Sequence, residues 1–237
     1  MMEVVYEDNH IIIVNKQSGE IVQGDKTGDR PLSDIVKDYI KEKYQKPGAV
    51  FLGVVHRLDR PVSGLVVFAR TSKALPRLNK MFAENEVHKT YWAIVCKSVG
   101  GRRKIADDGE WHTLENWIVR NEKQNKSYAY DREVPNSKLA RLKYRLIARG
   151  ERYDLVEVQL MTGRHHQIRC QLAKIGLPIK GDLKYGSPRS NKDGSICLLS
   201  RHMEFVHPVS KETIRVTAPL PDDPLWQAFG KIIANNN

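Results

Sequence analysis

The stretch KLARLKYRLIARGERYDLVEVQL, residues Lys138–Leu160, predicts the element that decides the fold class. Two segments rich in β-branched and aromatic residues, Lys138–Ala148 and Tyr153–Leu160, flank a turn at Gly150, which is the pattern of a β-hairpin. Strands joined by a tight turn pair antiparallel. The middle of the chain is therefore expected to form antiparallel sheet.

Outward from this hairpin, strands and helices do not alternate regularly. Further strands are expected at Val4–Tyr6, Ile11–Val14, Leu65–Ala69, Thr90–Cys96, Ile196–Phe205 and Thr213–Thr217. Helices are expected at Pro31–Tyr44 and at Pro224–Ala234. A third helix is expected to follow a cap at Ser72 and to bury Leu75, Leu78 and Phe82 on its inner face. A fourth is expected from the helical spacing of Ile168, Leu172 and Ile175. This mixture predicts an α+β fold with a mixed, largely antiparallel sheet flanked by helices and loops. Because no Pro/Gly/Ser-rich linker interrupts the chain, residues 1–237 are expected to form a single domain.

The composition is that of a globular protein, and its charge balance favours a polyanionic partner. Hydrophobic residues make up 41% of the 237 residues, which argues against wholesale disorder. Lysine and arginine number 39 against 28 acidic residues, a net charge of +11 that favours nucleic acid as the partner and an anionic membrane surface next. A protein that merely happens to be basic is the plainer alternative.

Several classes are disfavoured. No apolar run approaches the ~18 residues that span a bilayer. The acidic start of the sequence lacks the basic and apolar regions of a signal peptide, so a cytoplasmic protein without a membrane partner is expected. Cys96, Cys170 and Cys197 form no C-x-x-C pair and are expected to be buried thiols, neither disulfides nor zinc ligands.

The first candidate catalytic segment is Gly53–Leu65, which places Asp59 between Arg57 and Arg60. Opposite charges favour the ionised carboxylate, which can act as a nucleophile or a general base. The alternative is a turn carboxylate that caps a helix or pairs with a surface arginine.

The second such segment is Met161–Gln171, which is expected to enter a helix. Arg164, His165, Gln167 and Arg169 place several donors near the helix start, where a phosphate or carboxylate binds readily. A polar helix face is the alternative. His165 and His166 are not expected to chelate a metal, because adjacent helical residues point roughly 100° apart.

These segments resemble the RluA-type pseudouridine synthases. His56–Asp59 with Ser63–Leu65 resembles the family's H-R-L-D…S-G-L signature, Thr162–Arg169 its T-G-R-x-H-Q-I-R block, and Gly181–Gly186 its G-D-x-x-Y-G continuation. Lys89–Ala93 looks like its K-x-Y-x-A strand, and His207-Pro208 and Ala218–Pro221 look like its last pieces. The sequence departs from the pattern at Pro61-Val62, where D-T is usual, at Gln17 in the early K-P-x-G, and at Leu199-Ser200 in the late L-H-A.

The resemblance implies the pseudouridine-synthase catalytic fold and the isomerisation of uridine to pseudouridine without cofactor or metal. It implies catalytic roles for Asp59, Tyr91 and Arg169, with Arg169 pairing with Asp59. The substrate-binding residues it suggests are His56, Arg57, Arg164, Gln167 and Leu198. A non-catalytic RNA-binding module and a carboxylate-dependent nucleoside or sugar hydrolase are the alternatives.

The implied partner is a structured rRNA or tRNA whose target nucleotide is flipped out of a loop, bulge or hairpin. Phosphate contacts are expected from basic residues, namely Arg102, Arg103, Lys104, Lys184 and Arg189. A monomer without the S4-like RNA-binding domain of some family members is expected.

Overall fold

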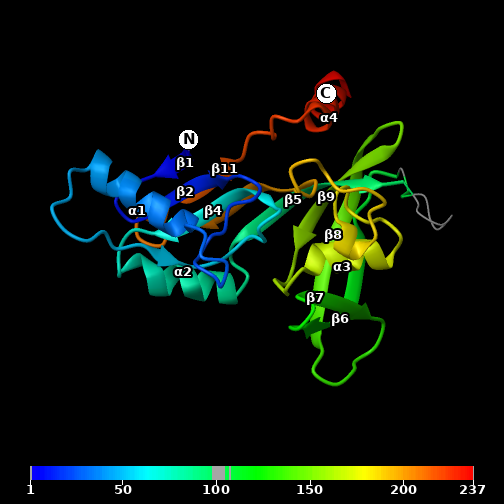
Figure 1. Cartoon of the computed structure of the whole chain (residues 1–237), viewed down its shortest axis with the longest axis horizontal. Helices are drawn as coiled ribbons and strands as arrows, with labels where there is room; N and C mark the ends of the chain where they lie inside the picture. The colour runs from blue at the N-terminus through cyan, green and yellow to red at the C-terminus, as the bar shows by residue number, and fades with distance from the viewer. Residues whose placement is uncertain (1, 98–104, 107, 237) are drawn as a thin grey trace. The chain divides into compact units, whose positions relative to one another are not determined.

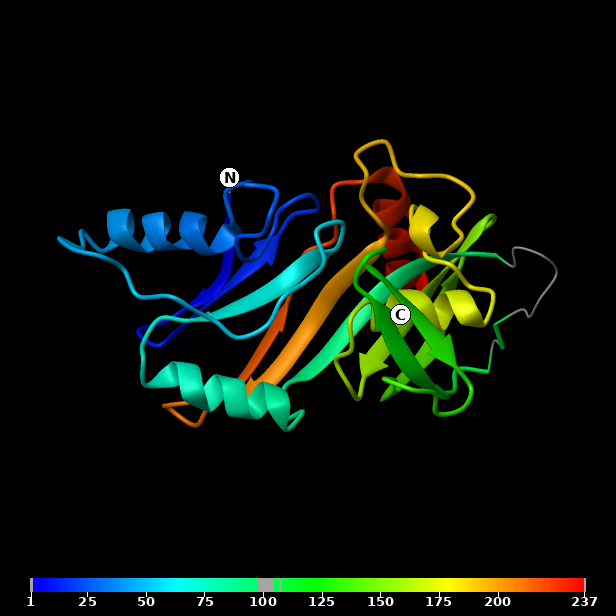
Figure 2. The ribbon, with the colours of Figure 1, turned by 60° about the horizontal axis from the view of Figure 1, so that its bottom comes forward.

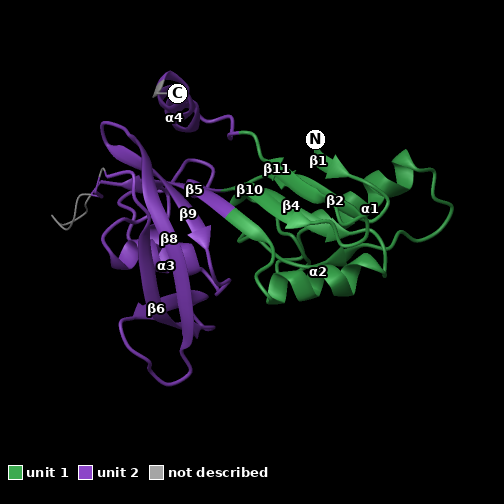
Figure 3. Cartoon of the chain, turned by 180° about the vertical axis from the view of Figure 1, so that it is seen from behind, with its two compact units in different colours: residues 1–89, 200–219 green, residues 90–199, 220–237 purple. Residues whose placement is uncertain are grey.

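The computed structural model describes residues 2–97, 105–106 and 108–236, and it divides into two compact units (Figure 3). Unit 1 comprises residues 1–89 and 200–219, and unit 2 comprises residues 90–199 and 220–237. The predicted contacts at Arg102, Arg103 and Lys104 lie outside the described residues. Among the described residues, no helix is both long and apolar enough to cross a membrane.

Unit 1 is built on a sheet with strand order β1-β2-β4-β10 (Figure 1). Its strands are β1 (Glu3–Glu7), β2 (Ile11–Lys16), β3 (Gly53–Val54), β4 (Ser63–Ala69), β10 (Leu198–Val206, in this unit from Ser200) and β11 (Thr213–Thr217). Strand β3 pairs with β4, and β11 pairs with β10. Every residue of β2 is buried, which explains its continuous run of isoleucine and valine in place of an alternating pattern.

Two helices complete unit 1. Helix α1 (Leu32–Lys43), which was predicted at Pro31–Tyr44, buries Leu32, Val36 and Ile40 at helical spacing. Helix α2 (Ala74–Ala83) starts later than the predicted Ser72 cap. The prediction of that cap is wrong, because the hydroxyl of Thr71 accepts the hydrogen bond from the Ala74 N–H at 3.2 Å.

Unit 2 contains the predicted hairpin and three further strands. The order is β5-β9-β8-β6-β7, formed by β5 (His88–Cys96, in this unit from Thr90), β6 (His112–Asn121), β7 (Lys126–Tyr130), β8 (Lys138–Arg149) and β9 (Tyr153–Leu160). All these pairings are antiparallel. A register shift between Leu146 and Ala148 marks a bulge in the hairpin. The hairpin prediction is confirmed to within one residue.

The helices of unit 2 are α3 (Gln167–Lys174), the 3-10 turn η1 (Leu183–Tyr185) and α4 (Pro224–Asn236). Helix α3 packs on β6 and β7 (Figures 1 and 2). Its buried Cys170 joins a cluster with Ile118, Ala140 and Tyr185. With antiparallel pairings and separate helices in both units, the predicted α+β class is confirmed.

Candidate active site

Asp59 lies in the turn between β3 and β4, and a buried lysine immobilises this turn. The ammonium of Lys16, at the end of β2, is completely buried and donates hydrogen bonds to the main-chain carbonyls of Gln17, Arg60 and Val62 at 3.0, 3.1 and 2.6 Å. Burial lowers the pKa of Lys16 to about 8, although the Asp59 carboxylate acts in the opposite direction. The backbone on both sides of Pro61 is therefore fixed from within the unit.

The same turn receives two further contacts from the segment after β2. The N–H of Gly19 donates to the Arg60 carbonyl at 2.9 Å, and the Ser18 hydroxyl donates to the Pro61 carbonyl at 3.3 Å. The Asp59 carbonyl itself accepts the N–H of Val62 at 3.0 Å. The main chain that carries Asp59 is therefore held in place, which suits a residue that takes part in a reaction.

The two arginines beside Asp59 behave differently. Arg60 turns away to form an ion pair with Asp29 at 2.6 Å and donates a hydrogen bond to the hydroxyl of Thr27 at 2.9 Å. Arg57 is exposed on the surface of unit 1. Of the two, Arg57 is therefore the one presented to solvent, as a nucleic-acid contact requires.

His56 holds the strand behind the turn. Its Nε2 accepts the backbone N–H of Val67 in β4 at 3.0 Å, and its ring stacks on Phe82 with centroids 4.5 Å apart. Burial, reinforced by the charge of Lys89, lowers the pKa of His56 to about 3. The imidazole is therefore neutral at physiological pH, and its proton lies on Nδ1.

In unit 2, Arg169 of α3 is one half of a buried ion pair. Its Nε and Nη2 donate to the two carboxylate oxygens of Asp182 at 2.7 and 2.9 Å, a bidentate arrangement. The guanidinium carbon also lies 5.1 Å from the ring centroid of Tyr185, within the range of a cation–π contact. Asp182 and Tyr185 thus fix the plane of the guanidinium.

Gln167 closes the loop that leads into α3. Its side-chain oxygen accepts hydrogen bonds from the Thr162 hydroxyl at 2.8 Å and from the Arg164 N–H at 2.9 Å. Its amide nitrogen donates to the Arg141 carbonyl at 3.0 Å. Gln167 is buried, whereas Arg164 is exposed and donates from Nε to the Leu139 carbonyl at 3.0 Å. Of the two predicted contacts, Arg164 is the one at the surface.

The two adjacent histidines precede the helix, so the predicted angle between them does not apply. His166 adopts a left-handed conformation with φ of 51°, and its ring stacks on that of His165 at 3.8 Å. The Nδ1 of His166 hydrogen-bonds the Tyr185 hydroxyl at 3.0 Å, and the Nδ1 of His165 hydrogen-bonds the Ser127 hydroxyl at 2.8 Å. No group of three or more potential metal ligands occurs in the part of the chain that the structure describes.

Tyr91 and Leu198 are placed by strands of unit 2. Tyr91 lies on β5 opposite Val158 of β9, and its side chain is buried. Leu198, at the first position of β10, is also buried, and its N–H donates to the Ile196 carbonyl at 2.8 Å. Both side chains therefore lie in the interior of unit 2 and not on its surface.

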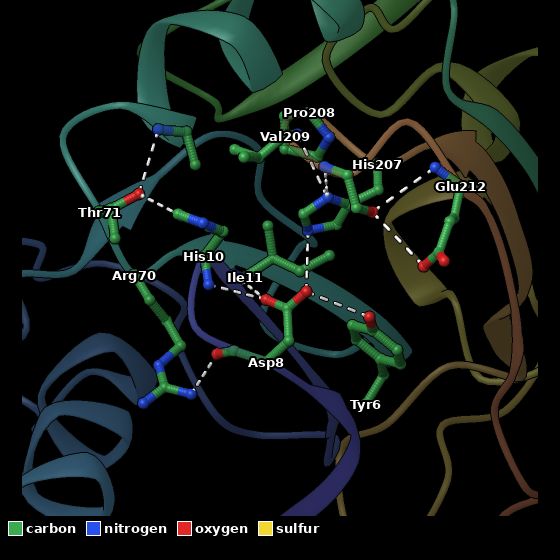
Figure 4. Close-up of polar contacts among 12 residues, drawn as sticks. Tyr6, Asp8, His10, Ile11, Arg70, Thr71, His207, Pro208, Val209 and Glu212 are labelled. Atoms are coloured by element: carbon green, nitrogen blue, oxygen red, sulfur yellow. Dashed lines mark hydrogen bonds and ion pairs between the residues drawn. The ribbon is translucent and has the colours of Figure 1, made fainter.

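Unit 1 also contains a pair of Asp8 and His207, whose contacts are structural (Figure 4). The Nε2 of the buried His207 lies 2.9 Å from an Asp8 oxygen. Its Nδ1 accepts the N–H groups of Val209 and Ser210 at 3.2 and 2.8 Å. With both ring nitrogens engaged, His207 has no nitrogen left to take a proton from a substrate.

Comparison with protein families matches residues 10–174 to RNA pseudouridylate synthases. The chain belongs to this family. The matched range contains Asp59, Tyr91 and Arg169. The prediction of an RluA-type pseudouridine synthase from the ordered motifs is thereby confirmed, and with it the prediction that the chain is an enzyme of the isomerase class.

Individual relatives agree with this assignment. The chain is 31% identical over 235 residues to the ribosomal large subunit pseudouridine synthase C of Vibrio cholerae, covering 97% of this chain and 69% of that protein. It is 32% identical over 241 residues to the tRNA pseudouridine synthase C of Yersinia pestis, covering 97% and 90%. The solved structure of human RNA pseudouridylate synthase domain containing 4 aligns with a TM-score of 0.74 at 20% identity, covering 98% of this chain and 93% of that one. The predicted catalytic fold is therefore confirmed.

For this pseudouridine synthase, the sequence missed the residues that support the predicted ones. Lys16 and Asp182 both belong to family-like patterns, K-x-x-G and G-D-x-x-Y-G. The sequence does not show which residues they contact. Of the other predicted phosphate contacts, Lys184 donates to the carbonyls of Gln124 and Asn125 at 3.3 and 2.9 Å. Arg189 is exposed in the described part of unit 2.

Proposed function

We propose that this chain converts uridine to pseudouridine in structured ribosomal or transfer RNA, with Asp59 as the essential carboxylate. The observation that carries the proposal is the Asp59 turn itself, in which a family-like H-R-L-D sequence is followed by Arg60 and Val62, whose carbonyls accept hydrogen bonds from the buried Lys16. Rigid presentation of one carboxylate is the geometry that nucleophilic or general-base chemistry requires. The family assignment supplies the reaction.

The reaction breaks the bond between C1′ and N1, rotates the base and rejoins it through C5, and it is redox-neutral. Asp59 acts as nucleophile or base. Arg169 serves as the catalytic arginine of the family-like block. Tyr91 stacks against the base and can transfer a proton through its phenol. Leu198 covers the apolar side of the base.

Substrate binding combines opening of the RNA with general electrostatic attraction. Flipping a nucleotide costs a few kcal/mol, least in loops and bulges, and Arg57 fills the gap that the nucleotide leaves. Arg164 contacts the RNA backbone directly. His56 and Gln167 act on the substrate through the turn and the loop that they hold in place. The net charge of +11 attracts the phosphates.

We also propose that residues 1–237 act as one catalytic domain, as a monomer in the cytoplasm. The two bacterial relatives support an RNA substrate, because one is named as a ribosomal large subunit pseudouridine synthase and the other as a tRNA pseudouridine synthase. No cofactor or metal takes part in the proposed reaction.

Pseudouridine sites are first mapped in cells with and without the gene for this chain, which identifies the substrate RNA. The purified protein is then assayed on that RNA. Wild type is expected to yield a product of unchanged mass that contains pseudouridine. Asp59→Asn is expected to abolish turnover while RNA affinity remains close to that of wild type. Asp34→Asn, which alters an exposed pair with Lys37, is the matched control and is expected to retain activity.

Three results would contradict the proposal. Appreciable turnover by Asp59→Asn would remove the carboxylate from the mechanism. Release of free uracil would identify a hydrolase. Tight binding without any pseudouridine, in vitro or in the cellular map, would identify a non-catalytic RNA-binding module.

A further inference from the structure

Lys89 is a half-buried cation without an acidic partner among the residues that the structure describes. It lies at the start of β5, and its ammonium is 5.0 Å from the ring centroid of Phe82 in α2. Burial lowers the pKa of Lys89, and no carboxylate acts to raise it. The aromatic ring positions the ammonium but does not neutralise it.

The aromatic rings of Phe82 and His56 beside Lys89 are held in place and carry no charge at physiological pH. Phe82 stacks on His56, with ring planes 17° apart, and His56 is tied to the backbone of β4 through Val67. With its pKa lowered to about 3, His56 contributes no positive charge at physiological pH. The positive charge of Lys89 is therefore held on a fixed aromatic support beside the residue that precedes Arg57.

Such an arrangement costs folding free energy, because a cation that loses water without gaining a counter-ion is destabilised. A protein keeps a group of this kind where a ligand supplies the missing charge. The ligand must then be an anion. The exposed Arg57, adjacent in sequence to His56, and the net charge of +11 favour a polyanion over a single carboxylate.

We propose that Lys89 binds a backbone phosphate of the substrate RNA. This inference rests on the proposed function, since it names a binding contact of the same enzyme. The ammonium donates hydrogen bonds to the phosphate oxygens, and the contact carries no sequence information. The cost of leaving Lys89 unpaired in the free protein is recovered when the RNA binds.

The test compares Lys89→Met with wild type on a uridine-containing RNA hairpin at several salt concentrations. Methionine keeps a long apolar chain against Phe82 but removes the charge. We expect RNA affinity to fall about tenfold at low salt, and the slope of log affinity against log salt to shrink by about 0.7–0.9, the value for one phosphate contact. Lys89→Arg should restore most of the affinity and the slope.

The same variant should not lose stability as a free protein. Because the unpaired cation is removed, the thermal midpoint of Lys89→Met is expected to equal or exceed that of wild type. Lys80→Met is the matched control, since Lys80 is an exposed lysine of α2 with Glu84 at 3.9 Å, and it should leave affinity and salt slope unchanged.

The proposal is overturned if Lys89→Met binds RNA with wild-type affinity, if affinity falls while the salt slope stays unchanged, or if the free variant unfolds at lower temperature. These outcomes are separate from the failure of the proposed function. A wild-type protein that binds the hairpin but produces no pseudouridine would refute isomerisation, and the comparison of affinities would still decide the phosphate contact.

Discussion

Arg169 and Asp182 meet through two parallel hydrogen bonds, Nε to Oδ2 at 2.7 Å and Nη2 to Oδ1 at 2.9 Å. Their side chains are only 6% and 1% exposed, so water screens the pair very little. The planar guanidinium is consequently held in one orientation by a carboxylate 13 residues further along the chain. Asp182 is thus a positioning residue for the predicted catalytic arginine.

We expect Asp182→Asn to cost about 3–5 kcal/mol of unfolding free energy, because it leaves the Arg169 charge buried without its counter-ion. Turnover should fall on the order of 100-fold through misplacement of the guanidinium, with a smaller change in KM. Urea unfolding and single-turnover rates measure the two effects. Asp131→Asn, which breaks an exposed pair with Lys174, is the control and should cost under about 1 kcal/mol. Equal losses in both variants would contradict the special role of the buried pair.

Gly64 is required by a close approach of two strands in unit 1. Its φ is +110°, and a Cβ there would lie 2.4 Å from the Ser200 carbonyl oxygen. We expect Gly64→Ala to destabilise the protein by about 3 kcal/mol, from backbone strain together with overpacking. At Gly19, with φ of +90° and open space around it, alanine should cost only about 1–2 kcal/mol. If denaturant midpoints show the two variants to be equivalent, the close approach is unimportant.

Lys16→Met should destabilise the folded protein by about 1–3 kcal/mol at pH 7, because the buried Val62 carbonyl loses its donor. The pKa of Lys16 is about 8 in the folded protein and 10.5 in the unfolded chain. Between these values the unfolded chain binds more protons, so the stability that depends on Lys16 rises with pH. The gap between wild type and Lys16→Met should therefore widen from about pH 8 to pH 10.5.

Urea unfolding at a series of pH values measures this gap for Lys16. Lys37→Met provides the control, because Lys37 is an exposed residue of α1, and its gap should stay flat. A gap for Lys16→Met that is constant from pH 7 to pH 10 would contradict the burial of a titrating ammonium.

Much of the fold was predictable because its signals are local. The hairpin around Gly150 and the buried face of α1 follow from residue type and spacing over a few turns. The cap of α2 was predicted at the wrong residue, since Thr71 and Ser72 are equivalent as sequence and only the path of the chain selects between them. The helix start at Gln167 was similarly decided by the left-handed backbone of His166.

By itself, the sequence determined the hairpin, most of the other strands, the four α-helices and the family, and it pointed to Asp59, Tyr91 and Arg169 through ordered motifs. Only the tertiary structure decided which residues hold the predicted site residues in place. Lys16, for example, donates hydrogen bonds to the carbonyls of Arg60 and Val62, which are 44 and 46 residues away. The physical reason is that periodicity and turn chemistry act between neighbours in the chain. A buried charge or carbonyl instead takes whichever partner the fold brings within hydrogen-bonding distance, and sequence separation does not encode that distance.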